Sequence, residues 1–159
     1  MPAPKRSERP RRIRIAKPAP VLDNGRYAVK RTVGDTVAVS ADIFRDGHEK
    51  LKAVVRYKAP GGRRWLEAPM HALDAHVSGV RWAGEFTVDA IGPAQWTVQA
   101  WVDVFAGWRD EIARKLDAGQ IDMSGEASEG VVLLKNAAGH ASGEDRAALQ
   151  AARDMVATG

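Results

Sequence analysis

Residues 36–44 read TVAVSADIF, and this stretch decides the fold class because its apolar residues fall at every second position. The apolar set is Val37, Val39, Ala41 and Ile43. Successive side chains of a β-strand point to opposite faces of its sheet, so the pattern predicts a strand with one buried face.

The same period of two recurs through residues 12–104, where turn-forming residues interrupt it. The further strands that we expect are 12–16, 50–58, 63–67, 80–88 and 95–104. The first should end before Pro18 and Pro20, and residues 59–62 (APGG) predict a hairpin turn. Many short strands with Trp82 and Trp96 at inward positions indicate an antiparallel β-sandwich of the immunoglobulin or fibronectin type.

After residue 104 the apolar spacing changes to that of a helix. Phe105, Trp108, Ile112 and Leu116 form one stripe, and Gly119 is suited to end the helix. A second helix is expected near residues 124–139, and a third with Ser142 as its N-cap. We therefore expect residues 105–159 to form a small and incomplete helical bundle appended to a mainly β domain.

The net charge of +4 is unevenly distributed along the chain. Basic side chains gather in residues 1–31, and the remainder is mildly acidic, so residues 1–11 are expected to be a disordered basic leader. A nucleic-acid-binding body would carry its basic residues on the folded surface. The chain has no cysteine and no apolar run of the roughly 20 residues that span a bilayer. We expect a cytoplasmic protein with neither a nucleic-acid nor a membrane partner.

Residues with the spacing of a catalytic or metal site are not found. The histidines are His48, His71, His76 and His140, and their spacing matches no metal motif. Asp42 and Asp46 could be imagined as a catalytic pair, but Asp46-Gly47 is typical of a turn. The sequence predicts no catalytic residue, no metal site and no cofactor.

Three tryptophans are candidates for an interface or a glycan-binding surface. Trp65 follows two arginines on an expected edge strand. Trp101 has the parity opposite to Trp96, so it should face away from the core. The helix that carries Trp108 could cover Trp101, and a partner could do so instead.

Several stretches resemble one known family, in the correct order from residue 12 to residue 120. They include residues 25–31 (GRYAVKR), 39–48 (VSADIFRDGH), 81–86 (RWAGEF), 96–103 (WTVQAWVD) and 115–120 (KLDAGQ). They are similar to the N-terminal domain of bacterial maltose-1-phosphate maltosyltransferases, which are related to the α-amylases of glycoside hydrolase family 13. The resemblance implies an immunoglobulin-like sandwich with an inserted helical bundle.

The resemblance also implies a division of function. Enzymes of this family transfer maltosyl units from maltose 1-phosphate to α-1,4-glucan with retention, using carboxylates in a (β/α)₈ barrel of roughly 250 residues. No catalytic residue can be carried over to this chain, which should be inactive alone and should meet donor and glucan only through that barrel. The expected role is homodimer assembly. The alternative is an autonomous α-glucan-binding module whose exposed tryptophans stack on sugar rings.

Overall fold

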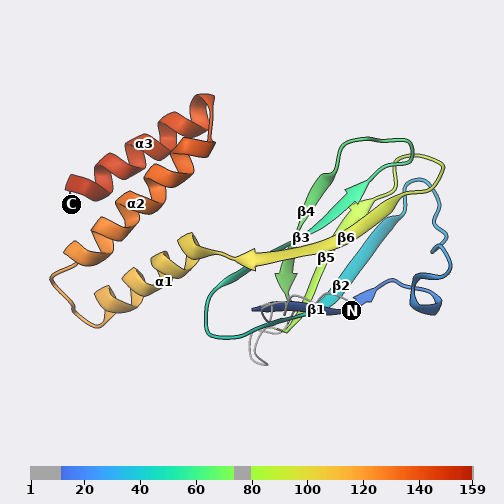
Figure 1. Cartoon of the computed structure of the whole chain (residues 1–159), viewed down its shortest axis with the longest axis horizontal. Helices are drawn as coiled ribbons and strands as arrows, with labels where there is room; N and C mark the ends of the chain where they lie inside the picture. Colours follow the sequence, from blue (N-terminus) through green and yellow to red (C-terminus); the bar gives the residue numbers. More distant parts are fainter. Residues whose placement is uncertain (1–11, 74–79, 159) are drawn as a thin grey trace, which may run out of the picture. The chain divides into compact units, whose positions relative to one another are not determined.

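The computed structural model describes residues 12–73 and 80–158. Within these residues the chain is mainly β with appended α-helices, which confirms the predicted fold class (Figure 1). The strands form one compact unit and the helices another, and the two divide between Val102 and Asp103. We call them the β unit and the helical unit. The expected leader, residues 1–11, and His76 lie outside the described residues.

The β unit is a single antiparallel sheet. Its strands are β1 (Ile13–Ala19), β2 (Thr36–Arg45), β3 (Leu51–Lys58), β4 (Leu66–Ala72), β5 (Arg81–Thr87) and β6 (Gln95–Val102). They lie side by side in the order β1-β2-β5-β4-β3-β6. The outermost strands, β1 and β6, approach each other, so the sheet curls into a nearly closed sandwich around its core. A single 3₁₀ turn, Asp23–Gly25, interrupts the long connection from β1 to β2.

The core has the composition that the alternation predicts. The buried residues in contact are Val37, Val39, Ala41, Ile43, Ala53, Val55, Met70, Trp82 and Phe86. Phe86 stacks on Tyr57 with ring centres 4.5 Å apart. Trp82 is buried as expected, whereas Trp96 is only partly buried at the margin of the core.

Two strands differ from their predicted bounds by three residues or more, β1 and β4. β1 continues past Pro18 because its pairing with β2 shifts between Ala16 and Ala19, and because an edge strand needs no amide donor on its open side. β4 begins at Leu66, so Trp65 precedes the strand, and β4 contains Pro69. Pro69 has a register partner in β3 but none in β5. Its lack of an N–H group therefore removes no hydrogen bond to β5.

Asp42 is buried on β2, and neighbouring strands supply its partners. The Arg81 guanidinium donates to Asp42 Oδ1 at 2.9 Å and to Ser40 Oγ at 2.8 Å. The Lys17 ammonium lies 3.3 Å from the other Asp42 oxygen. The hydrogen bond from Arg81, reinforced by Lys17, lowers the pKa of Asp42 below its ordinary value. Asp42 therefore links β1, β2 and β5 as a structural carboxylate.

Gly84 lies where β5 leaves no room for a side chain. A Cβ atom there would lie 2.6 Å from the Pro69 carbonyl oxygen and 2.9 Å from Met70 Cγ. We expect Gly84→Ala to lower the free energy of unfolding by about 1–3 kcal/mol through overpacking. Urea denaturation measures this, with Glu85→Ala as the control on the same strand, because Glu85 is exposed and its loss should change stability by less than about 0.5 kcal/mol. Equal effects of the two substitutions would contradict the packing seen at Gly84.

Candidate functional site

The helical unit contains three clearly bounded helices. Its helices are α1 (Val104–Asp117), α2 (Ser124–His140) and α3 (Gly143–Thr158). Asp103 begins α1 by accepting a hydrogen bond from the Ala106 amide at 2.9 Å. Gly119, with φ of 77°, follows the end of α1 as the sequence predicts. Helices α2 and α3 pack along their length, joined by a short turn (Figure 1).

Trp108 is the buried anchor between α1 and α2. It is 9% exposed, and its indole N–H donates to the Glu126 carbonyl oxygen at 2.8 Å. Its ring lies against Gly130, where a Cβ atom would be 2.1 Å from Trp108 Cζ2. Phe105 packs beside it with ring centres 5.3 Å apart. Of the three candidate tryptophans, Trp108 is thus engaged in packing within its own unit.

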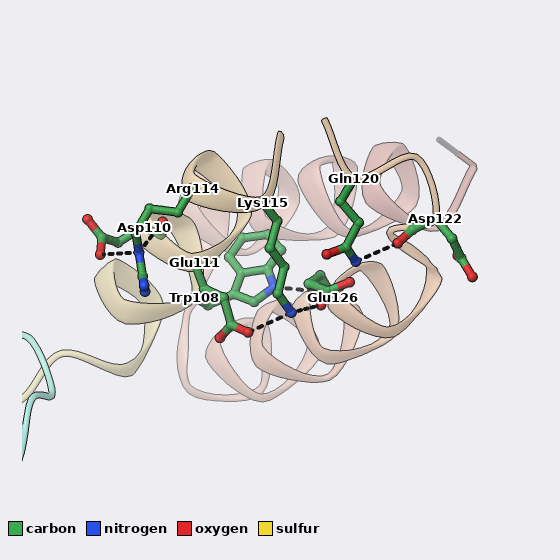
Figure 2. A network of polar contacts seen from close by, with 8 residues as sticks. All are labelled: Trp108, Asp110, Glu111, Arg114, Lys115, Gln120, Asp122 and Glu126. Atoms are coloured by element: carbon green, nitrogen blue, oxygen red, sulfur yellow. Dashed lines mark hydrogen bonds and ion pairs between the residues drawn. The ribbon is translucent and has the colours of Figure 1, made fainter. Parts of the chain in front are cut away.

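An ion cluster joins the same two helices next to Trp108 (Figure 2). Lys115 Nζ lies 2.7 Å from Glu111 Oε1 on α1 and also contacts the carboxylate of Glu126 on α2. The Glu126 side chain is only 13% exposed, so this pair is screened less than a surface pair. The hydrogen bond to Glu111, followed in size by the one to Glu126, raises the pKa of Lys115. The hydrogen bond from Lys115 lowers the pKa of Glu126.

The sequence reasoning missed this cluster and Gly130. The spacing of Glu111 and Lys115 was a visible i, i+4 signal on one helix. Nothing in the sequence pattern indicated that Glu126 and Gly130 of the next helix would meet Trp108 and Lys115.

Trp65 lies just before β4 and is half-buried. The Arg56 guanidinium and the Lys58 ammonium lie 5.7 Å and 5.4 Å from its ring centre, within the range of cation–π attraction. Arg56 also pairs with Glu67 at 3.3 Å. Trp65 therefore belongs to a cationic and aromatic cluster on the β3–β4 hairpin.

Trp101 lies on β6, beside the end of β3 that is far from Trp65. Its register partner is Lys52, whereas Leu66, the neighbour of Trp65, pairs with Tyr57. The structure therefore does not bring Trp65 and Trp101 together. Trp101 is 36% exposed within the described residues. Coverage of Trp101 by the Trp108 helix involves both units and stays a prediction.

A cavity of about 920 Å³ opens in the β unit beside Trp65. Its walls come from residues 20–33, the β5–β6 connection, and aromatic residues of the sheet end. The aromatic lining residues are Tyr27, Trp65, Phe86 and Trp96. No aspartate or glutamate is among the described residues that line it. We call this space the end cavity. No sequence pattern indicated this cavity, because residues 20–33 carry no apolar period.

Residues 12–73 and 80–158 contain no group of three or more His, Asp or Glu side chains that could hold a metal ion. No helix in the same ranges is long and apolar enough to cross a bilayer.

The model of the family "Alpha-1,4-glucan:maltose-1-phosphate maltosyltransferase, domain N/S" matches residues 11–158, which include every described strand and helix. The chain belongs to this family. The resemblance noted in the sequence is thereby confirmed, and it extends to the helices.

Individual maltosyltransferases match over most of the chain but little of their own length. The protein of Chlorobaculum tepidum is 40% identical over 94% of this chain and 22% of its own length. The protein of Myxococcus xanthus is 42% identical over 77% of this chain and 18% of its own length. The protein of Rhodospirillum rubrum is 37% identical over 87% of this chain and 21% of its own length. This chain therefore spans about a fifth of the length of these relatives.

A substitution at Gly130 tests how α1 and α2 of this maltosyltransferase domain are held together. We expect Gly130→Ala to lower helix stability by about 1–3 kcal/mol, because the new methyl group would displace the Trp108 ring. Gly139→Ala on the same helix is the matched control, since nothing lies within 4 Å of its Cβ position. That change should stabilise by about 0.5–1 kcal/mol through helix propensity. Thermal denaturation followed by circular dichroism at 222 nm measures the stability of both variants. If Gly130→Ala left the stability unchanged, the close contact between Gly130 and the Trp108 ring would be contradicted.

The lowered pKa of Glu126 predicts that the stability of the helical unit depends on pH. Because its pKa is lower in the folded state than in an unfolded chain, its ionised form stabilises the helices above the unfolded-state pKa. That contribution is lost as the pH falls through the lowered value. Glu126→Gln should therefore destabilise the helices most near neutral pH, and the difference from wild type should shrink as the pH falls below the ordinary pKa of glutamate.

Glu129→Gln is the control for this titration, because Glu129 is exposed on the same helix. Its difference from wild type should stay small throughout, as is usual for an exposed surface substitution. Urea denaturation at several pH values, followed by helical circular dichroism, provides the measurement. A gap between wild type and Glu126→Gln that widens in acid would refute the assigned ion pair.

Proposed function

We propose that this chain is the non-catalytic N-terminal assembly domain of a maltosyltransferase that extends α-1,4-glucan chains from maltose 1-phosphate. The observation that carries the proposal is the match to domain N/S over residues 11–158, combined with a span of about a fifth of its relatives. The proposed whole protein is a bacterial, cytoplasmic, retaining glycosyltransferase that works as a homodimer.

The chemistry of the described residues supports a non-catalytic role. Retaining transfer between sugars needs two carboxyl groups about 5–5.5 Å apart at a sugar-binding cleft. Asp42 is the buried carboxylate of the β unit, and Arg81 and Lys17 already occupy its oxygens. Glu126 is held in the same way by Lys115. We therefore assign the nucleophile and the acid/base to the remainder of the proposed enzyme.

The helical unit offers an apolar surface suited to assembly. Leu116, Ile121 and Met123 line two adjoining hollows near the α1–α2 connection, and Val156 of α3 borders both. Ile121 is 97% exposed and Leu116 more than half exposed. Apolar side chains gathered in this way are typical of a surface that a partner covers. We assign this surface to a second copy of the chain, since a two-fold interface uses the same patch twice.

Oligomeric state tests the assembly role. The chain should show a mass that rises towards a dimer with concentration in size-exclusion chromatography with light scattering. Ile121→Asp should weaken self-association at least about tenfold, because it places a charge at the interface. Ile91→Asp is the matched control, since Ile91 is a 92% exposed isoleucine of the β unit. A monomer at every concentration up to about 1 mM would refute the assembly role.

A further inference from the structure

We propose that the end cavity of the β unit binds a short segment of α-1,4-glucan. The identity of the polymer rests on the proposed function, and the existence and chemistry of the site rest on the cavity itself. The assembly surface lies on the helical unit and the end cavity on the β unit, so one chain can serve both roles.

Aromatic rings give the cavity flat apolar walls. Tyr27, Trp65 and Trp96 line it, and Tyr27 is 57% exposed. A glucose ring has a flat face of C–H groups and an edge of hydroxyl groups, so it stacks on an aromatic ring while its edge seeks hydrogen bonds. The exposed ring of Tyr27 and the accessible parts of Trp65 and Trp96 thus offer faces on which sugar residues can stack.

The cavity lining also contains polar groups. Arg31, Thr32 and Gln95 also line the cavity, and together they offer both hydrogen-bond donors and acceptors. Acidic side chains are missing from its described lining, so a neutral ligand would meet no buried carboxylate. Apolar walls with a few convergent polar groups are the usual composition of a ligand site.

Backbone hydrogen bonds fix one end of the wall that residues 20–35 form. The Gly34 amide donates to the Val88 carbonyl at 2.8 Å, and the Val88 amide donates to the Asp35 carbonyl at 2.9 Å. These bonds tie the end of residues 20–35 to the end of β5. In the β5–β6 connection, Gly92 has φ of 132°, and a Cβ atom there would lie 2.8 Å from Pro60 Cβ. A preformed cavity loses little ordering entropy when it binds a ligand.

The size of the cavity also fits an oligosaccharide. Its volume of about 920 Å³ is near the upper end of the 300–1,000 Å³ usual for ligand pockets, so it has room for more than one sugar ring. Ile91 at the rim is almost fully exposed. A single small metabolite would leave much of this apolar surface uncovered.

A nuclear magnetic resonance titration with maltoheptaose tests the site. The indole N–H resonance of Trp65 should shift on addition of the sugar, and that of Trp108, buried in the helical unit, should not. Tyr27→Ala and Ile91→Asp should each weaken binding about tenfold or more, since each alters a wall at an exposed position that the fold tolerates. Trp101→Ala and Ile121→Asp are the controls, and they should change the affinity less than about twofold.

Four results would overturn the proposal. One is the absence of any shift at about 10 mM maltoheptaose. Another is an equal response to cellohexaose, the β-1,4-linked counterpart. A third is loss of binding in Trp101→Ala with binding retained in Tyr27→Ala. The last is a Trp65 shift caused by raising the protein concentration without sugar, which would assign the cavity to a second copy. The first three results leave the light-scattering test with Ile121→Asp unaffected, so the two proposals can fail separately.

Discussion

The pairing of β2 with β5 fixes which side chains of the β unit reach its core. In the observed register Val39 pairs with Gly84 and Ala41 with Trp82, so the apolar parity of β2 faces inward. A slip of one residue would turn the apolar face outward. The same register places Asp42 opposite Arg81, which joins the two strands by a charged hydrogen bond. Apolar burial and charge pairing thus specify one alignment together.

The helical unit depends on a different kind of constraint. It has few large buried side chains in the described residues, and Trp108 and Leu134 are the principal ones. Contact between α1 and α2 therefore relies on the fit of Trp108 to Gly130 and on the Lys115 ion cluster beside it. A thin bundle of this kind gains little from area alone, so local fit decides whether the helices stay together.

Local patterns in the sequence predicted the helices and strands. Features that depend on contacts between distant segments could not be predicted from the sequence. The alternation in β2 and the apolar stripe through Phe105 and Trp108 each reflect the burial of one face of a single element, so the sequence alone predicts both. The passage of β1 through Pro18 depends on its place at the sheet edge, which only the whole topology reveals.

The candidate tryptophans show the same limit. Trp65, Trp101 and Trp108 were selected alike from the sequence, yet they have different surroundings. Cations from β3 lie over Trp65, and a glycine of α2 receives Trp108. The end cavity is built from the β1–β2 and β5–β6 connections, which carry no period, so the sequence could not indicate it.

The contact between Trp108 and Gly130 also restricts how sequences of this domain can diverge. A larger residue at 130 is compatible with the fold only if the ring at 108 becomes smaller, and a smaller residue at 108 leaves a void that only a larger residue at 130 can fill. Positions 108 and 130 should therefore change as a pair among homologous chains. That coupling would distinguish sequences that keep this helix pairing from those that share only the β-sandwich.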